Sequence, residues 1–263
     1  EMQERGDLVQ DEEGRWVEGP TLDWDTLPVR VEGVIEERIG RLDEELREAL
    51  TVASVEGEEF TAEVVARVRD LDERGLVRRL SRELDRQHRL VQARGRERIN
   101  HHRLSLYRFR HHLFQHYLYH SLDEVEREFL HEDVGSVLEE LYGEQATEIA
   151  PQLARHFLLA GDKERALPYL MEAGIRSQRA YAHEEALHYL RTALAAAEEL
   201  GDREEALTVI HEHLGDVLFN IGEYDGALSN YTAALDLLQE LPIPDGISKQ
   251  AAALCRKVGM VYE

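Results

Sequence analysis

Cysteine, lysine and long apolar runs are scarce in this sequence of 263 residues. The single cysteine, Cys255, excludes an internal disulfide and favours a reducing, cytoplasmic environment. No apolar run approaches the ~20 residues of a membrane-spanning helix, and the polar start EMQERGDLVQ is not typical of a signal peptide, so we expect no membrane partner. None of the three lysines completes a Gly-x-x-x-x-Gly-Lys-Ser/Thr loop, which excludes that way of cradling a triphosphate.

The charge of the chain is strongly negative and unevenly distributed. A formal net charge of −23 argues against a protein that binds polyanions with its whole surface. Residues 67–112 are the exception, because they hold 14 arginines against six acidic residues. This basic segment needs an explanation of its own.

Residues 146–263 repeat a short pattern. Ala-Leu pairs begin at Ala166, Ala186, Ala206 and Ala227, which are 20, 20 and 21 residues apart. Each interval fits one helix and a tight turn, and two intervals make a helical hairpin. A small residue lets the next helix approach closely, so we predict an α-solenoid in which each helix touches only its neighbours. An irregular helical bundle is the alternative.

The small residues also follow a register that resembles tetratricopeptide repeats (TPRs). The predicted packing positions are Ala154, Ala166, Ala173, Gly174, Ala186, Ala193, Gly215, Ala227 and Ala234. In this register two repeats share the helix at 163–181, and Gly259 and Tyr262 begin a repeat that is cut off. The resemblance implies a concave face that holds a protein or peptide ligand and carries out no chemistry.

The preceding part, residues 29–145, is predicted as a winged helix-turn-helix domain. Helical periods occur at 38–57, 61–68 and 71–91, although Gly75 is expected to break the third helix. The alternation around Leu104, Leu106, Tyr107 and Phe109 then predicts a β-hairpin with ARGRER (93–98) as its turn. Residues 1–28 are predicted as two short strands and a linker. The expected class is therefore mainly α, with a winged helix followed by a TPR-like solenoid.

Longer stretches resemble one family of signalling proteins. LPVRVEGVIEERIGRLDEELREALTVASVEGEEF is similar to the segment after the nucleotide-binding domain in bacterial signal-transduction ATPases with numerous domains (STAND proteins). YRFRHHLFQHYLY and the LARHFLLAGDKERALPYL region resemble the passage from winged helix to repeats, so the likeness covers about residues 14–240. It implies a regulatory fragment without a cofactor of its own. ATP or ADP would bind the nucleotide-binding domain of the parent chain, of which 1–28 would be the tail.

The resemblance also implies one nucleotide contact. Relatives of the plant and animal branch carry a Met-His-Asp-Leu motif, and RHHL at 110–113 falls at a similar place. His111 would then sense ADP in the full-length protein, although Arg110 and His112 depart from the motif. A structural histidine at a strand–helix junction is the alternative. His112, His116 and His120 also share a helix face with spacing that can hold Zn²⁺, but their neighbours Tyr117 and Leu118 favour packing.

The arginines of the basic segment suggest a rival function. The candidates for DNA or interdomain contacts are Arg78, Arg79, Arg82, Arg86, Arg94 and Arg96, with Arg89 and Arg98 beside them. In a DNA-binding winged helix the third helix enters the major groove and the wing contacts phosphates. Interleaved acids such as Glu83 and Asp85 instead favour a solvated, salt-bridged face.

No nucleophile–base grouping stands out, so the sequence predicts no enzyme, and Cys255 is expected to be buried in an alanine-rich helix. The preferred hypothesis is a sensor: the solenoid binds a protein or peptide trigger, and the winged helix relays its state to an ATPase switch. The alternatives are a transcriptional regulator whose winged helix binds DNA, and a scaffold without a switch.

Overall fold

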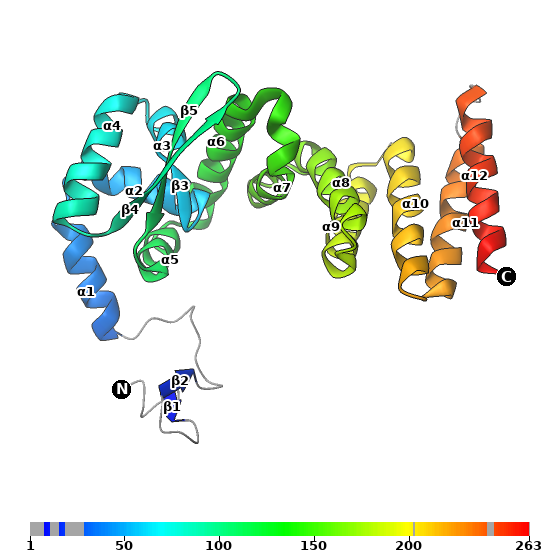
Figure 1. Ribbon diagram of the computed structural model, residues 1–263, viewed down its shortest axis with the longest axis horizontal. Coiled ribbons are helices and arrows are strands. Elements are labelled where there is room, and N and C mark those ends of the chain that lie inside the picture. Colours follow the sequence, from blue (N-terminus) through cyan, green and yellow to red (C-terminus); the bar gives the residue numbers. More distant parts are fainter. Residues whose placement is uncertain (1–7, 11–15, 19–28, 202, 241–244, 263) are drawn as a thin grey trace. The chain divides into compact units, whose positions relative to one another are not determined.

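The computed structural model describes residues 8–10, 16–18, 29–201, 203–240 and 245–262. Most of these residues are helical, as predicted, with a small sheet before the middle of the chain (Figure 1). Contacts divide the chain into two compact units. The first unit is Glu1–Arg98 with Arg103–Glu124, and the second is Ile99–His102 with Val125–Glu263. The sequence placed this division later, between residues 145 and 146.

The first unit mixes helices and strands. Its elements are β1 (Leu8–Gln10), β2 (Trp16–Glu18), α1 (Val29–Gly40), α2 (Glu44–Glu56), β3 (Glu59–Thr61), α3 (Ala62–Val68), α4 (Glu73–Arg79), the π-helix η1 (Leu80–Gln87), β4 (Val91–Ile99), β5 (His102–Phe109) and α5 (His112–His120). β1 and β2 pair antiparallel, with Val9 opposite Val17, as the two short strands predicted there would. The remaining predictions for 1–28 lie outside the described residues.

The core of the first unit lies between its helices and a three-stranded sheet. The strand order is β3-β5-β4, and β3 runs antiparallel to β5 with Phe60 opposite Tyr107. Phe60 also packs on Phe109 with ring centroids 5.2 Å apart. α2 begins because Asp43 accepts a hydrogen bond from the Leu46 amide at 3.0 Å, the usual way to cap a helix start.

Two sequence expectations in this unit are wrong. The predicted turn ARGRER is part of β4, and the chain turns instead at Asn100, which has a φ of 51°, and His101. Asparagine tolerates this left-handed conformation, so the turn needs no glycine. Gly75 does not break the third helix either. It lies in the first turn of α4, where its amide donates to the Asp72 carboxylate at 2.7 Å.

The second unit is a succession of helices. The 3-10 segment η2 (Gly143–Ile149) is followed by six α-helices in the described residues. With the helix before η2, the α-helices of the unit are α6 (Glu124–Tyr142), α7 (Ala150–Leu159), α8 (Lys163–Arg179), α9 (His183–Leu200), α10 (Glu204–Asn220), α11 (Tyr224–Glu240) and α12 (Asp245–Val261). From α7 onward each helix packs against the next one in the chain, as Figure 1 shows for α10, α11 and α12.

Glycines set which helices pack most closely. A Cβ added to Gly174 in α8 would lie 2.7 Å from the Cγ atom of Leu190 in α9. A Cβ added to Gly215 in α10 would lie 2.4 Å from the Tyr231 ring in α11. In both pairs the large residue follows the glycine by 16 positions, so α8 pairs with α9 and α10 with α11. All the small residues predicted as packing positions are buried.

Three of the turns have the same backbone conformation. The residue two positions after α7, α8 and α10 has positive φ: 76° at Gly161, 59° at Tyr181 and 84° at Gly222. In each turn the next amide donates back to a carbonyl five residues earlier, for example Glu223 to Leu218 at 2.9 Å. Tyr181 is the exception in composition, because a bulky side chain rarely adopts this conformation.

Candidate interaction surfaces

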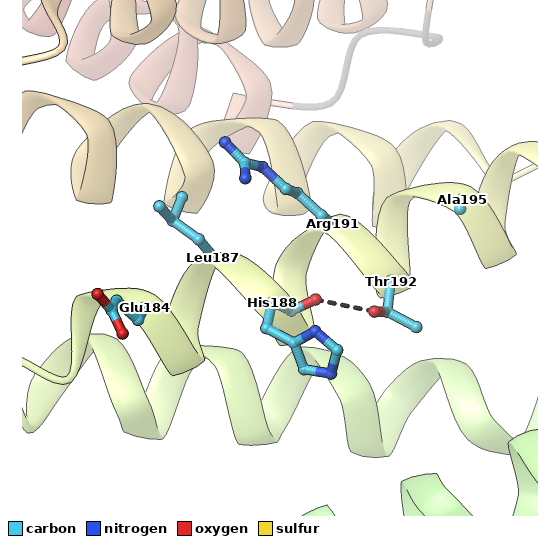
Figure 2. A pocket seen from close by; sticks show the side chains of 6 residues that line it. All are labelled: Glu184, Leu187, His188, Arg191, Thr192 and Ala195. Carbon is cyan, nitrogen blue, oxygen red and sulfur yellow. Dashed lines mark hydrogen bonds between the residues drawn. The ribbon is translucent and has the colours of Figure 1, made fainter. Parts of the chain in front are cut away.

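An open hollow lies on the helical unit, along α9 (Figure 2). Its volume is about 600 Å³, and its lining residues are Glu184, Leu187, His188, Arg191, Thr192 and Ala195. They lie outward because α9 buries the opposite stripe, which includes Ala186, Leu190 and Ala193. Helical periodicity therefore produces the hollow: one face packs and the other remains open.

The hollow combines a rim of mixed charge, with Glu184 beside Arg191 and His188, and an apolar floor. Arg191 and His188 are exposed, and Leu187 is half-buried against the core under α10 to α12. The Thr192 hydroxyl donates to the His188 carbonyl at 2.8 Å, shown dashed in Figure 2, so it is occupied within the helix. Arg191 forms no ion pair with any described residue. Its guanidinium is available to a carboxylate or a carbonyl of a ligand.

A half-buried polar cluster joins α10, α11 and α12. The Lys257 ammonium donates to Glu212 at 2.8 Å and contacts an Asp216 oxygen at 2.7 Å. The Tyr231 hydroxyl also donates to Asp216, at 2.9 Å. Burial lowers the pKa of Lys257, but the hydrogen bonds to the two carboxylates outweigh it and raise the pKa overall. Lys257 is shared between the two carboxylates, which ties α12 to α10.

Two histidines are buried between α6 and α7. His131 and His156 are both fully buried, and their Nδ1 atoms are 2.9 Å apart, so one ring donates to the other. Burial lowers the pKa of His131 to about 4, helped by the positive charge of Arg155. Burial likewise holds the pKa of His156 well below its usual value. Sequence patterns did not indicate this pair, because its members are 25 positions apart with no repeated spacing.

The arginines of the basic segment divide into two groups. Arg79 is a structural residue, because its guanidinium contacts Asp43, Glu45 and Glu83 within the first unit. These contacts raise its pKa, with the Glu83 hydrogen bond as the largest cause. By contrast, Arg78, Arg82 and Arg86 are exposed and form no ion pair with a described residue.

The strand arginines are similarly exposed. β4 is an edge strand, and residues 92–98 are all solvent-exposed. Arg94 lies 3.7 Å from Glu59, a long contact at the limit of an ion pair. Burial is the largest cause that raises the pKa of Tyr107, and the positive charge of Arg96 partly opposes it. The Tyr107 hydroxyl contacts Ser81 at 2.7 Å, which joins β5 to η1, the helix that carries Arg82.

The predicted histidine sites show no assembled centre. His111 is exposed at the start of α5, with its ring centroid 6.2 Å from that of Phe114, and its ADP role stays a prediction. The rings of His116 and His120 lie 4.0 Å apart. Among the residues that the structure describes, no group of three His, Cys, Asp or Glu side chains is arranged to hold a metal ion.

The prediction that Cys255 is buried is wrong. It lies on the exposed face of α12, because Leu254 occupies the adjacent buried position. Within the described ranges, no helix combines the length and apolar character that crossing a bilayer requires. Comparisons of the chain with protein-family models, with curated proteins and with solved structures find no match.

Proposed function

We propose that this chain is a regulatory module that binds a protein or peptide trigger on its second unit. In this proposal the helices from α6 to α12 form a TPR-like α-solenoid. The first unit is a winged helix that relays the bound state to the nucleotide-binding domain of a STAND-type parent. The chain itself is not an enzyme, and ATP or ADP would bind elsewhere in the parent.

The glycine register is the observation that carries the proposal. Gly174 and Gly215 are each met by the large side chain 16 residues further on, in the next helix of the chain. A repeated close approach of this kind is typical of stacked hairpins rather than of a closed bundle. Stacked hairpins leave one face of each helix open for a ligand, and the hollow along α9 is such a face.

The order of elements in the first unit supports the relay. The succession α2, β3, α3, α4 with η1, β4 and β5 is the order of helices and strands in a winged helix-turn-helix. β3 adds to the hairpin of β4 and β5 to make the three-stranded sheet. The STAND resemblance then supplies the partner, a nucleotide-binding domain. It also supplies the expected role of His111.

Selection from a random peptide display library on the intact chain tests the trigger site. We expect enriched peptides to carry an acidic residue that pairs with Arg191, because Arg191 lines the hollow and forms no ion pair with a described residue. Fluorescence polarisation with the best peptide should then give at least a tenfold weaker affinity for Arg191→Glu. Arg256→Glu is the matched control, since Arg256 is also exposed on a helix, and its affinity should change less than twofold.

Two results would count against the proposal. A chain that enriches no peptide sequence would remove the argument for a peptide trigger. Enriched peptides whose affinity falls equally in Arg191→Glu and Arg256→Glu would show that only the overall charge matters, and the hollow along α9 would then not be the site. Far-UV circular dichroism of both variants separates these outcomes from loss of structure.

A further inference from the structure

The exposed arginines of the first unit form a surface that the proposed peptide site does not use. Arg78, Arg82 and Arg86 follow one another at intervals of four along α4 and η1, so they share one face of the helical segment. All three are exposed. We refer to Arg78, Arg82 and Arg86, together with Arg96 and Arg98 of β4, as the arginine face.

The acids interleaved in this segment are directed elsewhere. The pairs are Asp72 with the Gly75 amide, Glu73 with Arg67, Glu83 with Arg79 and Asp85 with Arg110. Glu97 alternates with Arg96 and Arg98 along β4, which directs it to the opposite side of the strand. These acids are paired with the partners named, whereas Arg78, Arg82 and Arg86 form no ion pair with a described residue.

The composition of this face distinguishes between two kinds of anionic partner. Protein interfaces have a core rich in aromatic and other apolar side chains, whereas nucleic-acid interfaces are polar and positively charged. The exposed large apolar residues of the described chain, such as Phe129, Tyr181 and Met260, all lie outside residues 67–112. A surface of guanidinium groups without an apolar anchor fits phosphates better than it fits an acidic protein.

The dimensions of the helix fit the major groove of a duplex. Arg78, Arg82 and Arg86 span about two turns across the junction of α4 and η1, and the major groove, about 12 Å wide, admits a helix. Arg96 and Arg98 are exposed on the edge strand β4 of the same unit and add positive charge to it. We propose that the arginine face binds duplex DNA, mainly through its phosphates. This activity is independent of the peptide site on α9.

The negative charge of the remaining chain weakens this binding but does not forbid it. At physiological ionic strength charges separated by more than about 8 Å are largely screened from one another. Local arginines therefore dominate the contact, while the net charge of −23 keeps the affinity modest. We expect a dissociation constant in roughly the micromolar to 100-micromolar range, typical of binding without sequence preference.

Fluorescence anisotropy with a labelled 20-base-pair duplex, from 50 to 200 mM salt, tests the proposal with the intact chain. In the triple variant Arg78→Gln/Arg82→Gln/Arg86→Gln, we expect at least tenfold weaker binding at 50 mM salt. The slope of the logarithm of the association constant against the logarithm of the salt concentration should become less negative by about 2 to 3. Each phosphate contact that is lost changes this slope by about 0.9. The matched control, Arg179→Gln/Arg191→Gln/Arg256→Gln, removes the same charge from exposed arginines of the second unit and should change the affinity less than twofold.

Several outcomes would overturn the proposal. One is the absence of duplex binding at 50 mM salt. Another is an equal loss in the two triple variants, which would assign the effect to net charge. Tighter binding of a single strand than of the duplex would exclude the groove. Binding of polyglutamate with the same arginine dependence, and more tightly than the duplex, would identify the face as a dock for acidic protein. Circular dichroism of the variants confirms that they are folded.

Discussion

Replacing Gly215 by alanine should destabilise the second unit, although alanine is normally the better helix former. Gly215 lies inside α10 against the Tyr231 ring of α11. The new Cβ would lie 2.4 Å from Cε1 and 2.6 Å from Cδ1 of that ring, distances that real Cβ atoms do not adopt. Tyr231 is only 2% exposed, so its ring cannot turn into solvent.

The magnitude follows from opposing effects. Forcing an extra methyl into a packed site costs about 1–3 kcal/mol. Moving the ring also weakens the hydrogen bond from the Tyr231 hydroxyl to Asp216, which contributes about 1 kcal/mol. Against this, alanine gains about 1 kcal/mol over glycine within a helix. The net expectation is a loss of about 2 kcal/mol in the free energy of unfolding.

Gly259 provides the matched control. It lies in α12, 44 residues after Gly215, and a Cβ added there meets nothing within 4 Å. Gly259→Ala should therefore stabilise the chain by up to about 1 kcal/mol through helix propensity alone. Urea denaturation followed by far-UV circular dichroism measures both variants, as shifts of the midpoint at an unchanged slope. If Gly215→Ala proved as neutral or stabilising as Gly259→Ala, the close approach of α10 and α11 would be refuted.

Three further expectations concern strain, pH and the polar cluster. Tyr181→Gly should raise the free energy of unfolding by about 1 kcal/mol, because glycine adopts the φ of 59° without the left-handed penalty, and thermal melting measures this. The pKa of His131 is about 4 in the folded chain against an ordinary value of 6.5, so the unfolded chain binds more protons between these pH values. The free energy of unfolding should therefore fall by up to about 3 kcal/mol as the pH drops from 6.5 through 4. Urea denaturation across this range measures the fall, and the double variant His131→Leu/His156→Leu should reduce it. Lys257→Met removes the cation from the Glu212 and Asp216 carboxylates, while the Tyr231 hydroxyl still donates to Asp216, and should cost about 1–2 kcal/mol at pH 7 by urea denaturation.

The helices of the second unit could be predicted from the sequence because their apolar and small residues recur at a helical period. The sequence did not predict which of these helices approach one another most closely. The sequence register assigned the helix at 163–181 to two hairpins. In the structure α8 packs against both α7 and α9, and Gly174 makes its closest approach to Leu190 of α9. Packing of the helix at 163–181 on the preceding helix and on the following helix both place a small residue beside a large one. Only the distances in the structure show which of the two approaches is closer.

The hairpin of the first unit was harder to place because β4 carries no pattern. Residues 92–98 are all exposed, so the alternation that marks a half-buried strand is absent there. The glycine and charges of ARGRER are typical of turns, whereas the true turn at Asn100 and His101 lacks glycine. An edge strand that is solvated on both faces resembles a loop in sequence and differs only in its partner strand.

The basic segment shows why charge along the chain is a poor guide to charge on a surface. Glu83 lies four residues after Arg79 and pairs with it, as the helical spacing predicts. Asp85, however, is neutralised by Arg110, which is 25 residues further on and follows β5. Both acids are therefore paired with arginines other than Arg78, Arg82 and Arg86. By bringing a strand end beside a helix, the fold leaves three exposed arginines without an ion pair to a described residue, and those arginines are the reason to test this surface for phosphate binding.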